Sequence, residues 1–235
     1  MASFEPAVDA FERSAALFQQ VGQVTGAAHF HQYAARTFLV HPGLADGEAV
    51  RQARVSLGRA KALVTRHGAP IRWSSVRADL ADAHRRLGTR RGADQAVELA
   101  REAFGVPDRE SDPKDWALCG RSLMTALAAR AGHGGRHAVV QASEARDLLR
   151  AVVPVLQDRC TLPERLDLQV EVSQVLRVAA VLLGQPALLA EAELALGLAR
   201  PQADERGYAR LVDLLDAEEG RCAKARAALG IGPVS

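Results

Sequence analysis

The chain has 235 residues with 30 basic and 28 acidic side chains, so its formal charge is only +2. This balance argues against a polybasic surface for nucleic acids or membrane headgroups. Hydrophobic residues make up 48% of the chain and aromatic residues 4%, which excludes a disordered chain and disfavours a β-sandwich or barrel. The commonest residues are Ala (45), Leu (29) and Arg (27), all strong helix formers, so the composition predicts an all-α protein.

Turn-forming residues divide the chain into segments of about 12–22 residues, the usual length of helices in globular proteins. The interruptions fall at residues 22–25, 41–43, 67–70, 88–92, 106–107, 132–135, 160–163, 184–186, 200–201 and 220. They predict about eleven helices joined by short connections, with antiparallel neighbours. Gly88 and Gly132 suit the left-handed residue that ends a helix, and the segment from Cys160 to Glu164 is typical of a helix start.

Within this series, two segments repeat the same pattern, at 73–107 and 116–154. Their leading tryptophans, Trp73 and Trp116, are 43 residues apart. Each is followed by Leu seven residues later and by Ala ten residues later, and then by a second helix with spaced small residues. A weaker copy of that second helix precedes them, with Ala53, Leu57 and Ala60. The recurring spacing indicates repeated helix pairs, each of which buries its apolar face against the next.

The pattern resembles the tetratricopeptide repeat (TPR) family, with its best match over residues 70–157. The matching residues are Leu80, Ala81, His84, Gly88, Ala96, Ala103 and Pro107, then Leu123, Leu127, Ala145, Val152 and Pro154. Degenerate copies are expected at 1–69 and 160–230. The resemblance implies a right-handed α-solenoid of stacked antiparallel helix pairs, forming a single domain over 1–235. Small residues such as Ala96 and Ala103 are then expected where helices approach closely.

No motif in the chain points to catalysis, a cofactor or a metal. The pairs His29/His31 and His133/His137 lack the further donors that zinc requires. Nucleophile motifs and phosphate-binding loops are also missing from the sequence, so we expect a protein that is not an enzyme and takes no cofactor.

The apolar stretch 175–199 is interrupted by Arg and Glu, so no membrane association is expected. The first residues carry no basic or apolar leader, and the three cysteines form no CxxC pair. These features favour a cytoplasmic protein with reduced thiols.

The TPR resemblance implies that the first helix of each pair lines a concave groove for a peptide or helix of another protein. Successive first helices then present a row of candidate partner-binding residues: Ser75, Asp82, Arg85, Arg121, Thr125 and Gln174. An Arg fork in this row would suit a partner's carboxylate through two parallel hydrogen bonds. The alternative, that these side chains are simply solvated, stays open.

The leading hypothesis is therefore a non-catalytic, protein-binding scaffold or regulatory module. The alternative is a ligand-sensing regulatory domain, or the helical part of a signalling protein, in which Val178, Val181 and Leu182 would line a small-molecule pocket. Homodimer formation through apolar residues such as Leu194 and Leu198 also stays open.

Overall fold

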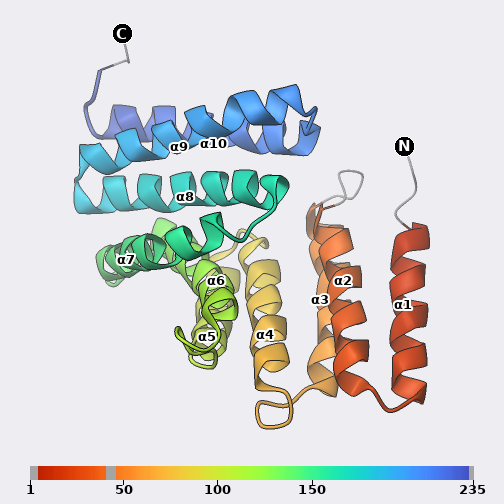
Figure 1. The fold of residues 1–235 in the computed structure, drawn as a ribbon. Helices are drawn as coiled ribbons and strands as arrows, with labels where there is room; N and C mark the ends of the chain where they lie inside the picture. The colour runs from red at the N-terminus through yellow and green to blue at the C-terminus, as the bar shows by residue number, and fades with distance from the viewer. Residues whose placement is uncertain (1–4, 41–45, 233–235) are drawn as a thin grey trace. The chain divides into compact units, whose positions relative to one another are not determined.

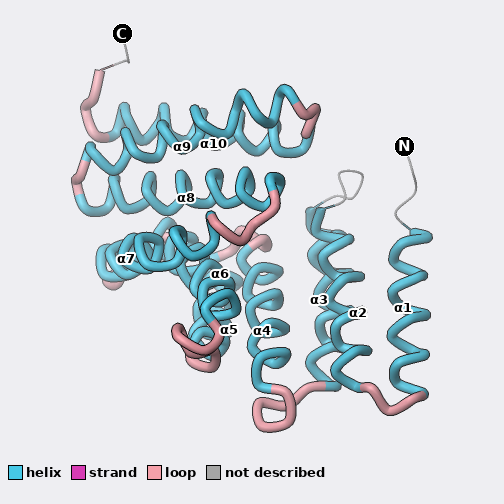
Figure 2. Tube along the Cα trace, in the orientation of Figure 1, coloured by secondary structure: helices cyan, strands magenta, loops and turns pink. Residues whose placement is uncertain are grey.

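The computed structural model describes residues 5–40 and 46–232, and the only regular secondary structure in these ranges is helical (Figures 1 and 2). The all-α prediction is thereby confirmed for this part of the chain. The ten helices are α1 (Glu5–Gln20), α2 (Val24–Val40), α3 (Asp46–Leu63), α4 (Pro70–Arg85), α5 (Arg90–Phe104), α6 (Pro113–Gly132), α7 (Ala138–Gln157), α8 (Leu162–Leu183), α9 (Pro186–Glu205) and α10 (Ala209–Ala228).

The chain divides into two compact units, one ending at Ala126 and the other beginning at Leu127. In the N-terminal unit, α1 packs on α2, α2 on α3, α3 on α4 and α4 on α5, and α2 also contacts α4. In the C-terminal unit, α7 packs on α8, α8 on α9 and α9 on α10, and α8 also contacts α10. Packing against chain neighbours, with added contacts two helices apart, is consistent with a helical repeat.

The starting points of alternate helices are evenly spaced along the chain. Helices α2, α4, α6, α8 and α10 begin 46, 43, 49 and 47 residues apart. The spacing of Trp73 and Trp116 predicts this interval, because each lies in the first turn of its helix, α4 or α6. Sequence positions 43–49 residues apart therefore occupy similar places in successive helix pairs.

Small side chains form much of the core. In the N-terminal unit, a buried cluster joins α2, α3 and α4; its members include Ala28, Ala35, Ala53, Leu57, Ala60, Val76 and Leu80. The predicted contact residues Ala96 and Ala103 of α5 have no exposed surface. Alanine at these positions brings helix axes close together, so a larger side chain would have to displace its neighbours.

Several helix ends follow from local sequence. Gly88 has φ +65°, and the hydroxyl of Thr89 then accepts a hydrogen bond from the backbone N–H of Gly92 at 3.1 Å, capping α5. The predicted start near Cys160–Glu164 is confirmed, because α8 begins at Leu162 and the carboxylate of Glu164 accepts from the N–H of Thr161 at 2.8 Å.

The predicted helix end at Gly132 is confirmed, because Gly132 is the last residue of α6. The left-handed conformation expected at Gly132 is wrong, because it falls on Gly134 and Gly135, whose φ values are +72° and +107°. The side chain of Arg130 stabilises the new turn by donating to the carbonyl oxygen of Gly134 at 2.9 Å.

The prediction of about eleven helices is also wrong, since ten occupy the described ranges. The expected breaks at Arg200–Pro201 and Gly220 lie inside α9 and α10, and the real turn is at Gly207, with φ +64°. Pro201 removes one backbone donor from α9, whereas Gly207 adopts the left-handed conformation that reverses the chain. A glycine inside a helix costs only about 1 kcal/mol, which the packing of α10 offsets at Gly220.

Candidate functional site

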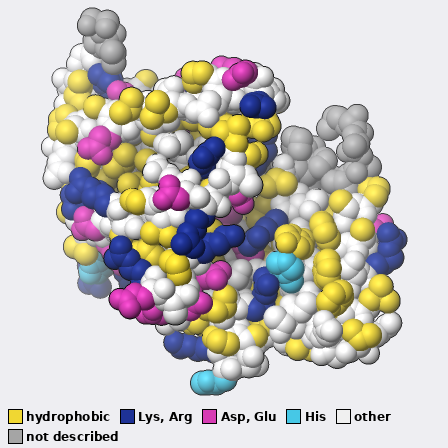
Figure 3. Space-filling view, viewed as in Figure 1, with side chains coloured by type: hydrophobic (Ala, Val, Ile, Leu, Met, Phe, Trp, Pro, Cys, Tyr) yellow, Lys and Arg dark blue, Asp and Glu magenta, His cyan; other side chains and the backbone are white. Residues whose placement is uncertain are grey.

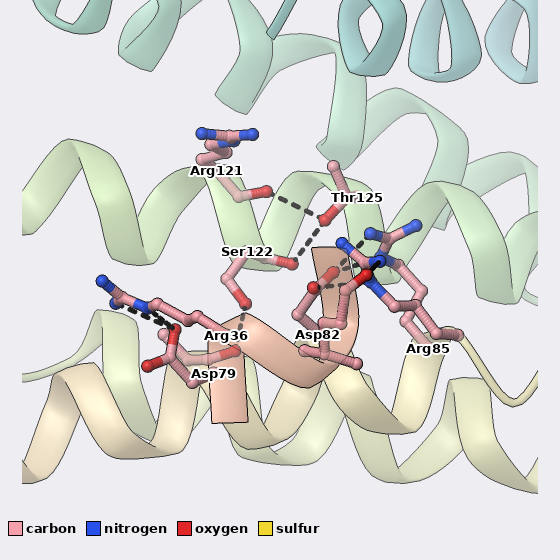
Figure 4. Close-up of polar contacts among 10 residues, drawn as sticks. Arg36, Asp79, Asp82, Arg85, Arg121, Ser122 and Thr125 are labelled. Atoms are coloured by element: carbon pink, nitrogen blue, oxygen red, sulfur yellow. Dashed lines mark hydrogen bonds and ion pairs between the residues drawn. The ribbon is translucent and has the colours of Figure 1, made fainter. Parts of the chain in front are cut away.

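Three of the predicted binding residues, Ser75, Asp82 and Arg85, lie half-buried on α4. Arg121 and Thr125 lie on α6, in the same compact unit. Figure 4 shows the acidic groups of α4 with their arginines beside the polar residues of α6. We call this surface the polar face; it comprises side chains of α2, α4 and α6, including Arg36, Asp79, Asp82, Arg85, Arg121 and Thr125.

On α4, Asp82 binds Arg85, the last residue of the helix, and Arg86, which follows it. The Nε of Arg85 donates to one carboxylate oxygen at 3.1 Å, and the Nε of Arg86 donates to the other at 2.9 Å. Burial by itself would raise the pKa of Asp82, but the two guanidinium groups outweigh it and hold this pKa well below its usual range. Arg86 also donates to the backbone carbonyl oxygen of Leu39 on α2 at 3.1 Å. Both the Nε and the Nη2 of Arg85 thus already donate to the carboxylate of Asp82.

Thr125 is buried, with 7% of its surface exposed. Its hydroxyl lies 3.1 Å from the backbone carbonyl oxygens of Arg121 and Ser122, so it is satisfied within its own helix. Ser122 is the link from α6 to α4, because its hydroxyl donates to the carbonyl oxygen of Ala78 at 3.1 Å. This link fixes α6 against α4 where the polar face crosses from one helix to the other.

Sequence reasoning missed the contribution of α2 to the polar face. Arg36 forms an ion pair with Asp79 of α4 at 3.0 Å, and the amide of Gln32 donates to Asp79 at 2.7 Å and to Ser75 at 3.0 Å. Burial raises the pKa of Asp79 despite these contacts, and Asp79 in turn raises the pKa of Arg36. The signal was present in the repeat spacing, since Arg36 and Asp79 are 43 residues apart, as are Gln32 and Ser75.

The same 43-residue spacing joins His29 of α2 to Arg72 of α4. The Nη1 of Arg72 lies 2.6 Å from the Nδ1 of His29 and donates to the side-chain oxygen of Gln32 at 3.0 Å. Burial, followed by the charges of Arg72 and Arg36, lowers the pKa of His29. His29 is therefore neutral near pH 7, with its Nδ1 lone pair accepting from the guanidinium.

Gln174 belongs to the C-terminal unit, where it lies half-buried on α8. Near it, α8 contacts α10 through Arg177, whose Nε donates to the fully buried carboxylate of Glu218 at 2.5 Å. Arg221 is the second partner of Glu218, at 3.0 Å. The apolar side chains predicted to line a pocket also lie on α8; Val181 is 41% exposed, and Val178 and Leu182 are half-buried.

Metal-ligating and thiol groups form no cluster in the described ranges. No group of three or more His, Cys, Asp or Glu side chains lies close enough there to hold a metal ion. The three cysteines form no disulfide with one another, and burial raises the pKa of Cys119 to about 12, so this thiol stays protonated at neutral pH. None of the helices in the described ranges is long and apolar enough to span a bilayer.

Figure 3 shows one face of the molecule, on which a histidine lies beside Lys and Arg side chains and among exposed hydrophobic ones.

No protein-family model matches the chain, and no curated protein matches it either.

Proposed function

We propose that the chain is a non-catalytic binding module that docks a peptide or helix of another protein on the polar face. The observation that carries this proposal is the continuity of that face. Partly exposed charged side chains run from Arg36 on α2, over Asp79 and Asp82 on α4, to Arg121 on α6. Such a surface extends over the three alternate helices α2, α4 and α6.

Hydrogen bonds and ion pairs among the residues of the polar face and their neighbours hold its three helices together. Gln32 and Arg36 hold α2 to α4 through Asp79, and Ser122 holds α6 to α4. A partner that binds such a preorganised surface has little ordering entropy to overcome. Fixed polar groups with little freedom to rearrange also favour one partner chemistry over others.

The even spacing of α2, α4, α6, α8 and α10 further supports a TPR-like repeat, in which these are the first helices of successive pairs. On that assignment, Asp82, Thr125 and Gln174 occupy the same position, since each lies 12 residues after the start of its helix. We propose that this common position marks the binding side of each pair.

Selection of short random peptides on the immobilised full chain tests the proposal. The test variant Arg85→Gln/Arg121→Gln removes two charges from the polar face, and the control Arg90→Gln/Arg91→Gln removes two from the exposed start of α5. We expect selected peptides to bind the wild-type chain and the control alike. Their affinity for the test variant should fall about tenfold or more, the effect of losing one charge-assisted contact.

Melting curves of both variants separate lost binding from lost folding. A selection that enriches no peptide, or peptides that bind the folded test variant as tightly as the wild-type chain, would contradict the docking proposal.

A further inference from the structure

Arg72 differs from the other arginines around it in its partners. Arg36 is paired with Asp79, and Arg85 and Arg86 share Asp82. Arg72 instead meets two neutral acceptors, the imidazole of His29 and the amide oxygen of Gln32, both through Nη1. In the described part of the chain it has no ion-pair partner, so its charge is held in place without being neutralised.

The opposite edge of the Arg72 guanidinium is unused. Nε is buried and has no hydrogen-bond partner, and Nη2 makes no hydrogen bond although it is not buried. An oxygen atom of a partner cannot reach the buried Nε, but it can reach Nη2. A carboxylate is the acceptor that a guanidinium N–H binds most strongly, because the hydrogen bond is assisted by both charges.

The surroundings of Arg72 favour an acidic side chain over a nucleic-acid backbone. A phosphate backbone is bound by several basic groups along its path, whereas the nearby Arg36 is already neutralised by Asp79. Beyond the guanidinium, the ring of Tyr33 packs 4.3 Å from that of His29 and is 38% exposed, and Val40 farther along α2 is 50% exposed. A bound chain would continue over these apolar groups, so its carboxylate belongs to a side chain inside the segment.

From this arrangement we propose that the Nη2 group of Arg72 binds an Asp or Glu side chain of the docked segment, next to an apolar side chain that packs on Tyr33. The inference rests on the proposed function and adds the chemistry of one contact. Because His29 and Gln32 fix Nη1, the guanidinium is oriented before the partner arrives.

The test uses a peptide selected on the wild-type chain and measures its affinity by fluorescence anisotropy. Replacing its acidic residue with the matching amide, Asp→Asn or Glu→Gln, should weaken binding about tenfold or more. The variant Arg72→Gln should bind both peptides equally weakly. Arg72→Lys keeps the positive charge but loses the planar guanidinium that His29 and Gln32 orient, so it should recover only part of the affinity. Arg91→Gln, an exposed arginine on α5, is the control and should behave as the wild-type chain.

The outcomes separate the two proposals. Selected peptides that show no preference for an acidic residue, or that keep this preference with folded Arg72→Gln, would overturn the Arg72 assignment and leave the docking proposal standing. If amidation of the peptide's C-terminus abolishes binding, the carboxylate that Arg72 binds is the terminal one. This result would overturn the assignment to an Asp or Glu side chain. Competition by single-stranded DNA at equal charge would point to phosphate recognition and overturn the inference. Selection of no peptide would overturn both proposals.

Discussion

Replacing Arg177 with Leu should destabilise the C-terminal unit by leaving a buried carboxylate short of a partner. Glu218 of α10 has no exposed side-chain surface, and it binds Arg177 at 2.5 Å and Arg221 at 3.0 Å. Removing one partner of a buried ion pair costs about 3–5 kcal/mol. Arg221 remains beside the carboxylate in the variant, so we expect the lower end of this range, about 3 kcal/mol.

Urea unfolding followed by far-ultraviolet circular dichroism measures this loss. With a slope of about 2–3 kcal/mol/M, the midpoint should fall by about 1–1.5 M. Hydrogen exchange of the α8 and α10 amides should report the same loss within the unit that carries the change.

The double variant Arg177→Leu/Glu218→Leu removes both buried charges and should recover most of the stability, because apolar replacements of a buried pair are often neutral. Arg221→Leu should cost less than Arg177→Leu, since the side chain of Arg221 is 52% exposed and that of Arg177 only 20%. Two results would refute the reasoning: a midpoint unchanged in Arg177→Leu, or a double variant that is as unstable as the single one.

Two further changes test the packing and electrostatics of the N-terminal unit. Ala96→Leu puts a large side chain where Ala96 has no exposed surface, and it should lower the free energy of unfolding by about 1–3 kcal/mol; an unchanged melting temperature would contradict the close helix contact. The pKa of Asp82 is lowered in the folded state, so its ion pairs stabilise the fold above the ordinary carboxyl pKa, and this contribution is lost as the pH falls through the folded value. The stability difference between wild-type and Asp82→Asn chains should therefore be constant near neutral pH and shrink below about pH 4, whereas a difference independent of pH would exclude this linkage.

Much of the fold follows from short-range signals in the sequence. The positive-φ glycine at 88 and the Thr161–Glu164 start are local features, and the composition alone predicts helices. The errors also arise from local reasoning. Gly220 lies inside α10 because packing can outweigh the small cost of a helical glycine, and this packing involves residues far away in the chain.

The candidate site was predictable only in part, because Arg36 and Gln32 reach it from α2, far from the other residues in the chain. Asp82 and Arg85, three residues apart on α4, could be placed on one face from helix periodicity, and their ion pair follows from the same spacing. Arg36 and Gln32 could be found only by extending the 43-residue interval to α2, where Phe30 stands 43 residues before Trp73. Without that interval, nothing in the sequence near Asp79 identifies the arginine that pairs with it.

Whether the charge of an arginine is neutralised depends on the residue that faces it one repeat away. Asp79 stands 43 residues after Arg36 and neutralises it, whereas His29 stands 43 residues before Arg72 and only orients it. An acid at position 29 would neutralise Arg72 as Asp79 neutralises Arg36. The neutral histidine leaves the charge of Arg72 intact and fixes the orientation of its guanidinium. In a chain whose net charge is only +2, such pairing between helices decides where positive charge remains without an acidic partner, and the overall composition does not.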